Sequence, residues 1–185
     1  MELQISLKKI LKKGSIANEL EFQRASIIDR QLRLLVKEMP ELAGERNQLR
    51  KLLHVYEQQH WVDREITDEQ VRESDLAAEI AEQEREFLEK RKQIIKARLK
   101  ELNLTQKELG KILGHTSSTY MSELITGVNP FTLNDLVIIN RLLNIDLSVL
   151  IPTTLNREQV NKINNNVLKL NHPKLKFKMG DFTGA

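Results

Sequence analysis

The chain has 185 residues, no cysteine and a formal net charge of +3 at pH 7. The lack of cysteine excludes disulfides and thiolate sites, and no apolar run approaches the roughly 20 residues of a membrane-spanning helix. Aromatic residues make up 4% of the chain and glycine and proline are scarce, which favours helices over a β-sandwich or barrel. We therefore expect an all-α, cytoplasmic protein that has no signal peptide and no contact with a membrane.

The charge is distributed unevenly along the sequence. Residues 1–91 contain 16 Lys and Arg against 19 Asp and Glu, whereas residues 92–185 contain 13 against 7. A basic half is suited to a polyanionic partner such as nucleic acid. A solvated basic surface is the alternative interpretation of the same excess.

The first part of the sequence predicts a small helical domain over 1–66. Apolar residues recur at helical spacing over 28–36 and again over 49–56, and Pro40 separates the two stretches. Each helix has one apolar face, which must pack against the other helix or against a partner. We expect partner binding here.

A long charged helix is predicted next, over 67–91. Thr67 is suited to cap its N-terminus, and two acids follow in the first turn, where the helix dipole favours negative charge. Between Glu65 and Glu89 there are ten acidic residues and two basic ones. A short coiled-coil seam is one interpretation of its few apolar positions, but a solvated linker helix is favoured.

A compact five-helix domain is predicted over 92–151, followed by a basic tail over 152–185. After a first helix near 92–102, helices are expected at Gln106–Leu113, Ser118–Thr126, Leu133–Asn144 and Leu147–Ile151. The tail predicts one more short helix. An alternation of Lys with Leu175, Phe177 and Met179 then has the period of a strand, with disorder as the favoured alternative.

The stretch LTQKELGKILGHTSSTYMSELITG carries the clearest signals. Thr105 and Glu108 form a capping box, and a glycine stands where each of the two helices should end. Gly110 lies in mid-helix at a cost of roughly 1 kcal/mol against alanine, which suggests that the second helix crosses closely there. Ser117 or Ser118 is suited to cap the second helix.

These residues resemble the helix-turn-helix of the Cro/C1 repressor type, through LTQKELGKILG, MSELITG and FTLNDL. The resemblance covers roughly 92–151 and implies sequence-specific binding of double-stranded DNA, with the second helix in the major groove. It implies phosphate contacts from the first of these helices and base contacts from the start of the second. The candidate DNA-binding residues are Gln106, Lys107, Lys111, Ser117, Ser118, Thr119, Tyr120, Ser122 and Glu123.

The second helix has no Arg or Lys on its reading face. Phosphate attraction must then come from nearby lysines and arginines, at 92, 96, 98, 107 and 111 or in the tail, and we expect a homodimer. His115 lies in the turn between the helices, where it is expected either to contact phosphate or to be solvated. Glu123 is suited to accept a bond from cytosine but would repel phosphates.

A second resemblance lies in LLVKEMPELAGERNQLRKLLHVYEQQHW, which is followed by the DNA-binding domain. This arrangement is similar to antitoxins of the HigA type. The resemblance implies a transcriptional repressor that neutralises a small ribonuclease toxin and represses its own operon in the nucleoid. The long acidic helix and the tail depart from that type. An acidic helix is suited to cover the basic surface of an RNA-binding toxin, with a solvated spacer as the alternative.

Two other functions remain open. One is a stand-alone Cro/C1-type regulator, and the other is a protein-interaction module that does not read DNA. An enzyme, a cofactor and a metal site are not expected. His54 and His60 are six residues apart rather than four, and Ser117 and Ser118 lack the flanking glycines of a nucleophile elbow.

Overall fold

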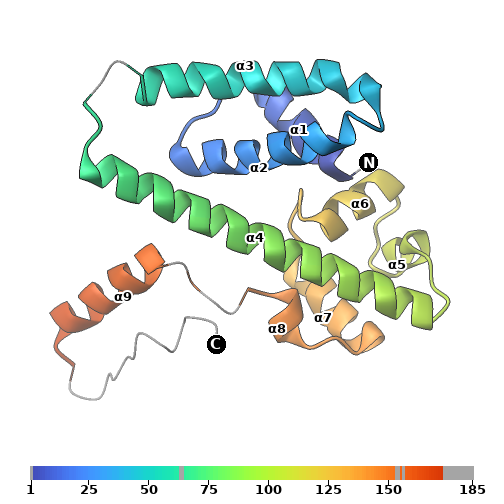
Figure 1. Ribbon diagram of the computed structural model, residues 1–185. Helices are drawn as coiled ribbons and strands as arrows, with labels where there is room; N and C mark the ends of the chain where they lie inside the picture. The colour runs from blue at the N-terminus through green and yellow to red at the C-terminus, as the bar shows by residue number, and fades with distance from the viewer. Residues whose placement is uncertain (1, 63–64, 153–154, 156, 173–185) are drawn as a thin grey trace.

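The computed structural model describes residues 2–62, 65–152, 155 and 157–172. Every regular element in these ranges is helical, which confirms the predicted all-α fold (Figure 1). In chain order the elements are α1 (Glu2–Lys13), α2 (Glu19–Leu35), the 3-10 turn η1 (Pro40–Leu42), α3 (Ala43–His60), α4 (Asp68–Glu101), α5 (Gln106–Ile112), α6 (Ser118–Thr126), α7 (Leu133–Leu143), α8 (Leu147–Leu150) and α9 (Arg157–Leu170). None of the helices in these ranges is long and apolar enough to span a bilayer.

The three N-terminal helices enclose a core of their own. Helix α2 begins at the cap Asn18, whose side chain accepts a hydrogen bond from the amide of Glu21, and α3 begins after Pro40. The core is formed by Leu7, Ala25, Leu32, Leu42, Leu49 and Leu53. Leu7 comes from α1, a helix that the sequence analysis did not predict, and it is fully buried.

Helix α4 is a single rod that reaches from the N-terminal core to the second core (Figure 1). Thr67 caps it as expected, in a capping box with Gln70. The rod continues without a break through residues 91 and 92, where the sequence suggested a boundary. Its first half is solvated on one face only, because Ala77 and Ala81 on the other face are buried where the helix packs beside α2.

The second core lies at the C-terminal end of α4, among α5, α6, α7 and α8. It is formed by Ile95, Leu99, Leu109, Leu113, Met121, Leu124, Ile125, Phe131, Leu136, Ile139, Leu143, Ile145 and Leu150. Burial of a leucine or isoleucine side chain stabilises a fold by roughly 1.5–3 kcal/mol. The five-helix prediction is confirmed, with three of the helices ending one residue earlier than expected.

Helix α9 follows this core and is the helix predicted for the tail. Val160 is buried, while Leu168 and Leu170 near its end are exposed. The alternation proposed as a strand, at residues 175–179, lies outside the described residues.

Candidate nucleic-acid interface

Helices α5 and α6 pack closely against each other at Gly110. A Cβ atom at this position would lie 3.2 Å from the main-chain oxygen of His115 and 3.4 Å from Cγ of Met121. The steric reason suggested for a glycine in mid-helix is therefore confirmed. The capping box of Thr105 and Glu108 is also formed, with the Thr105 amide donating to the Glu108 carboxylate over 2.8 Å.

Helix α6 begins and ends at the residues that the sequence indicates. The hydroxyl of Ser117 accepts a hydrogen bond from the amide of Tyr120 over 3.2 Å, so Ser117 is the N-cap. Met121, Leu124 and Ile125 are its buried stripe. Gly127 ends the helix at a φ of 79°, a left-handed conformation that glycine adopts without steric cost.

The candidate DNA-binding residues form two groups. Lys107 and Lys111 are exposed one turn apart on α5, and Gln106 is half-buried at its first position. Ser117, Ser118, Thr119, Tyr120, Ser122 and Glu123 all belong to the cap or first two turns of α6, and the first four are exposed. The structure thus presents both the start of α6 and two cations of α5 to solvent, an arrangement suited to base and phosphate contacts.

Ser122 and Glu123 are less accessible than the residues before them. Both are half-buried, and the Glu123 carboxylate accepts a hydrogen bond of 2.6 Å from the side-chain amide of Asn129. This bond occupies part of the carboxylate that was expected to face cytosine. Asn129 lies in the loop after α6, a contact that the spacing of the sequence did not indicate.

His115 was expected to touch phosphate or to be solvated, and the structure instead gives its ring two partners within the protein. Its Nε2 donates to Oδ1 of Asp135 over 3.1 Å, and its ring meets the edge of Tyr120 with centroids 5.2 Å apart. Burial raises the pKa of Asp135. Hydrogen bonds from the amide and hydroxyl of Thr132 and from His115 lower it by more than burial raises it, so the pKa of Asp135 lies below its ordinary value. His115 therefore ties the turn to the start of α7.

Two of the cations expected to attract phosphate are paired within α4. Lys92 contacts the carboxylate of Glu89, and Arg98 lies 2.7 Å from that of Glu101. Pairing within one helix reduces their field at the reading face. Lys107 and Lys111 are exposed on α5, the helix that packs against α6.

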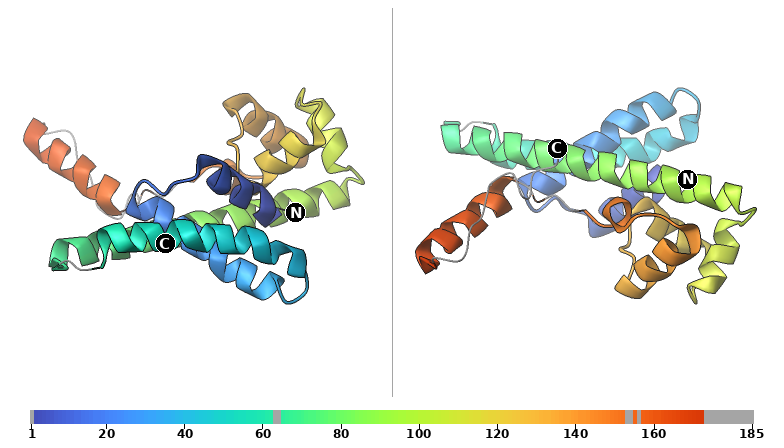
Figure 2. Two further views of the ribbon diagram at one scale, coloured as in Figure 1. Left: turned by 90° about the horizontal axis from the view of Figure 1, so that it is seen from above. Right: turned by 90° about the horizontal axis from the view of Figure 1, so that it is seen from below.

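The C-terminal end of α6 is held by residues from outside the helix-turn-helix. Lys9 of α1 donates to the main-chain oxygen of Val128 over 3.0 Å. The side chain of Leu88 packs on Gly127 so closely that a Cβ atom there would overlap it. Figure 2 shows α1 with the pair α2 and α3 on one side and α6 on the other. Sequence reasoning missed these contacts because they join segments far apart in the chain.

The capped pair α5–α6, crossing at a glycine within a five-helix core, defines a helix-turn-helix DNA-binding domain. Residues 95–150 match the family model described as helix-turn-helix, a segment that begins inside α4 and ends with α8. The Cro/C1-type domain indicated by the sequence is therefore present and supports a DNA-binding transcriptional regulator. The match covers less than a third of the chain.

No curated protein and no solved structure matches the chain. The domain supports binding to double-stranded DNA, and DNA-binding domains of this family are typically non-enzymatic. Among the described residues, no His, Asp and Glu side chains are grouped so that they could hold a metal ion.

Proposed function

We propose that this protein is the antitoxin of a type II toxin–antitoxin pair, which represses its own operon as a homodimer. The helix-turn-helix domain carries the DNA-binding part of the proposal. The toxin-binding part is supported by the resemblance of the N-terminal helices to HigA-type antitoxins and by their separate core. The proposed units are residues 1–66 for the toxin, 67–91 as an acidic helix, 92–151 for DNA and 152–185 as a basic tail.

The observation that carries DNA reading is the exposure of the first turn of α6. Ser118 and Thr119 are exposed there, beyond the cap Ser117. In our proposal Ser117, Ser118, Thr119 and Ser122 read bases, and Gln106, Lys107 and Lys111 hold phosphates. The N-terminal residues of a recognition helix are the ones that reach base edges in the major groove.

Dimer formation is supported by apolar side chains on α7. Leu133 and Val137 are one turn apart and expose 76% and 55% of their surfaces. Two such side chains on one face of a helix are suited to a symmetric contact with a second copy. A dimer would double the number of phosphate contacts, which compensates for a reading helix without Arg or Lys.

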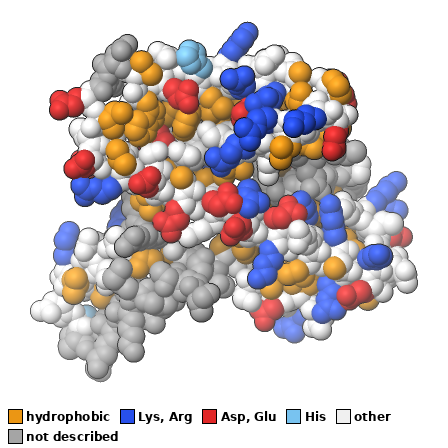
Figure 3. Space-filling model, in the orientation of Figure 1, with side chains coloured by type: hydrophobic (Ala, Val, Ile, Leu, Met, Phe, Trp, Pro, Cys, Tyr) orange, Lys and Arg blue, Asp and Glu red, His pale blue; other side chains and the backbone are white. Residues whose placement is uncertain are grey.

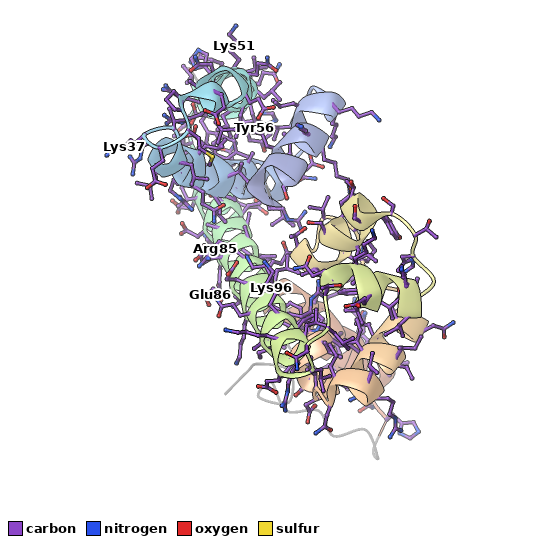
Figure 4. The ribbon with its side chains drawn as sticks, turned by 90° about the vertical axis from the view of Figure 1, so that its right-hand side faces the viewer. Lys37, Lys51, Tyr56, Arg85, Glu86 and Lys96 are labelled. Carbon is purple, nitrogen blue, oxygen red and sulfur yellow. The ribbon has the colours of Figure 1, made fainter. Side chains whose placement is uncertain are left out.

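The toxin-facing surface we propose is an acidic stripe formed by Asp75, Glu79, Glu82 and Glu86. These residues are three, four and seven apart, so they share one face of α4, opposite the buried Ala77 and Ala81. Figure 3 shows acidic side chains along the middle of the molecule, over α4, and Figure 4 shows Glu86 on the side of α4 away from α5 and α6. Such a stripe complements a basic, RNA-binding partner.

The experiment that tests DNA reading is a titration of the purified protein against its own promoter and a scrambled duplex, at two salt concentrations. We expect the promoter to bind about a thousandfold more tightly or better, as specific sites do. Equal and strongly salt-dependent binding of both duplexes, or no binding, would contradict DNA reading by the isolated chain.

The toxin is tested separately, with the protein encoded by the gene beside this one. We expect that protein to co-purify with the full chain and to lose its ribonuclease activity in the complex. A neighbouring gene product that neither binds nor cleaves RNA would favour the stand-alone regulator, while leaving the DNA titration unaffected.

A further inference from the structure

A cleft of about 1370 Å³ separates the N-terminal helices from the helix-turn-helix core. Its walls are largely apolar and come from both cores and from α4. They include Ile28 and Leu35 on one side, Leu136 and Leu150 on the other, and Ile80 of α4. Small-molecule sites in proteins are clefts of several hundred Å³ with apolar walls and a few polar groups that orient the ligand. The volume of this cleft is sufficient for such a ligand.

Arg91 of α4 also lines this cleft and is 7% exposed. Its guanidinium lies between the rings of Phe87 and Phe131, 5.5 and 5.3 Å from their centroids. Its two terminal nitrogens donate to the main-chain oxygens of Leu124 and Leu150 over 3.5 Å. Its Nε is buried and has no hydrogen-bond partner among the described residues. Both bonds are at the outer limit of hydrogen-bond geometry.

The other cations that line the cleft already have partners. Lys9 donates to the main-chain oxygen of Val128 over 3.0 Å. Arg24 is held by Glu84 at 2.7 Å, Arg85 by Glu82 at 2.6 Å, and Lys92 contacts Glu89. Arg91 has no carboxylate within ion-pair distance among the described residues, and burial lowers the pKa of its guanidinium. Burying a guanidinium that has five N–H donors and only two long hydrogen bonds costs free energy, unless an anion accepts bonds from the remaining donors.

We propose that the cleft is a binding site for a small monocarboxylate with an apolar body, whose carboxylate pairs with Arg91. A carboxylate matches the planar guanidinium with two parallel bonds, and the apolar walls would bury the rest of the ligand. The carboxylate competes for the same N–H groups as the oxygens of Leu124 and Leu150. Because Leu124 belongs to α6, occupancy of the cleft acts on the recognition helix. The proposal does not depend on the antitoxin function.

The test is calorimetric titration of the full-length protein with octanoate and with octanamide, its uncharged counterpart. We expect octanoate to bind at least about tenfold more tightly than octanamide, the effect of one charge-assisted pair. In Arg91→Met the preference for octanoate should disappear, while circular dichroism and unfolding stay close to wild type. Absence of octanoate binding, or a preference that survives in Arg91→Met, would overturn the proposal.

A second pair of variants tests the same proposal without changing the buried residue Arg91. Leu34 lines the cleft and is 62% exposed, so Leu34→Asp places a negative charge beside the ligand without disturbing a core. The matched control is Val55→Asp, on α3 and 52% exposed, outside the cleft. We expect Leu34→Asp to weaken octanoate severalfold and Val55→Asp to leave it unchanged. Equal effects of the two variants would contradict binding in this cleft.

Discussion

The Nζ atom of Lys9 lies 3.0 Å from the main-chain oxygen of Val128, 119 residues further along the chain. This bond joins α1 to the residue that follows Gly127, the C-cap of α6. A cation at the end of a helix also interacts favourably with the helix dipole. The N-terminal helices are thereby attached to the helix that we propose reads DNA.

We expect Lys9→Met to loosen this attachment with little loss of global stability. The bond is exposed, so the free energy of unfolding should fall by at most about 1 kcal/mol. Hydrogen exchange should accelerate in peptides covering α1 and the end of α6. Lys8→Met is the matched control, because Lys8 is exposed next to it on the same helix. Equal exchange in the two variants would show that the bond does not hold α1 in place.

Two glycine-to-alanine substitutions should change stability in opposite directions. At Gly110 the added methyl group would contact the side chain of Met121 and the main-chain oxygen of His115, and a main-chain atom cannot move aside as a flexible side chain can. At Gly44, in the first turn of α3, a Cβ atom would have no atom of the described residues within 4 Å beyond its own helix backbone and chain neighbours. We expect Gly44→Ala to stabilise by roughly 0.5–1 kcal/mol from helix propensity. Gly110→Ala should instead destabilise, by about 1–3 kcal/mol from overpacking. Urea unfolding measures both, and a stabilised Gly110→Ala variant would refute close packing of α5 on α6.

Local signals in the sequence predicted the helix-turn-helix well. Caps, glycine stops and 3.6-residue periodicity act over a few residues, so Thr105, Ser117 and Gly127 have the roles expected of them. Helix α1 was not predicted, although Leu7 is fully buried. Its sequence shows one short apolar stripe, and the helices that cover this stripe come later in the chain.

Asp135 should make the stability of the helix-turn-helix depend on pH in the acidic range. Hydrogen bonds from Thr132 and His115 outweigh burial, so the pKa in the folded state lies below the ordinary carboxyl value of about 3.9. The stabilisation is fully present above that value and is lost as the pH falls through the folded pKa. Asp135→Asn should cost about 1–3 kcal/mol at pH 7, and its difference from wild type should shrink below about pH 4.

The measurement is urea unfolding of both proteins between pH 7 and pH 3. Asp75→Asn is the control, since Asp75 is exposed on α4 and its substitution changes the same chemical group. A constant difference between wild type and Asp135→Asn at every pH would mean that the carboxylate is not the source of the effect.

Side-chain contacts made only in the folded chain explain what the sequence could not predict at the site. Glu123 was expected to face DNA, but Asn129 in the following loop takes up part of its carboxylate. His115 was placed in the turn, but its partner Asp135 is 20 residues away. In a sequence such pairs look like independent polar residues. The first pair depends on the path of the loop after α6, and the second on where the fold places the start of α7.

Base reading and phosphate binding should be separable by mutation. The double variant Ser118→Ala, Thr119→Ala removes two hydroxyls from the exposed start of α6 and should reduce the ratio of promoter to scrambled-DNA affinity. Lys107→Ala should weaken both duplexes alike and lower the salt slope by about one, as the loss of a phosphate contact does. Fluorescence anisotropy at several salt concentrations measures both quantities. The same loss on both duplexes in both variants would refute the assignment of roles.

Charge reversal in the acidic stripe should weaken binding of the toxin and leave DNA binding intact. The variant Asp75→Lys, Glu79→Lys, Glu86→Lys changes three exposed residues of α4. Glu82 of the stripe and its neighbour Glu84 are left out of the variant, because Arg85 and Arg24 pair with their carboxylates at 2.6 and 2.7 Å. Six units of added positive charge should slow association with a basic partner and weaken neutralisation of its ribonuclease activity. The DNA titration of the same variant is the control. Unchanged neutralisation would exclude the stripe as the toxin-binding surface, whereas weaker binding of both partners would indicate a general loss of structure.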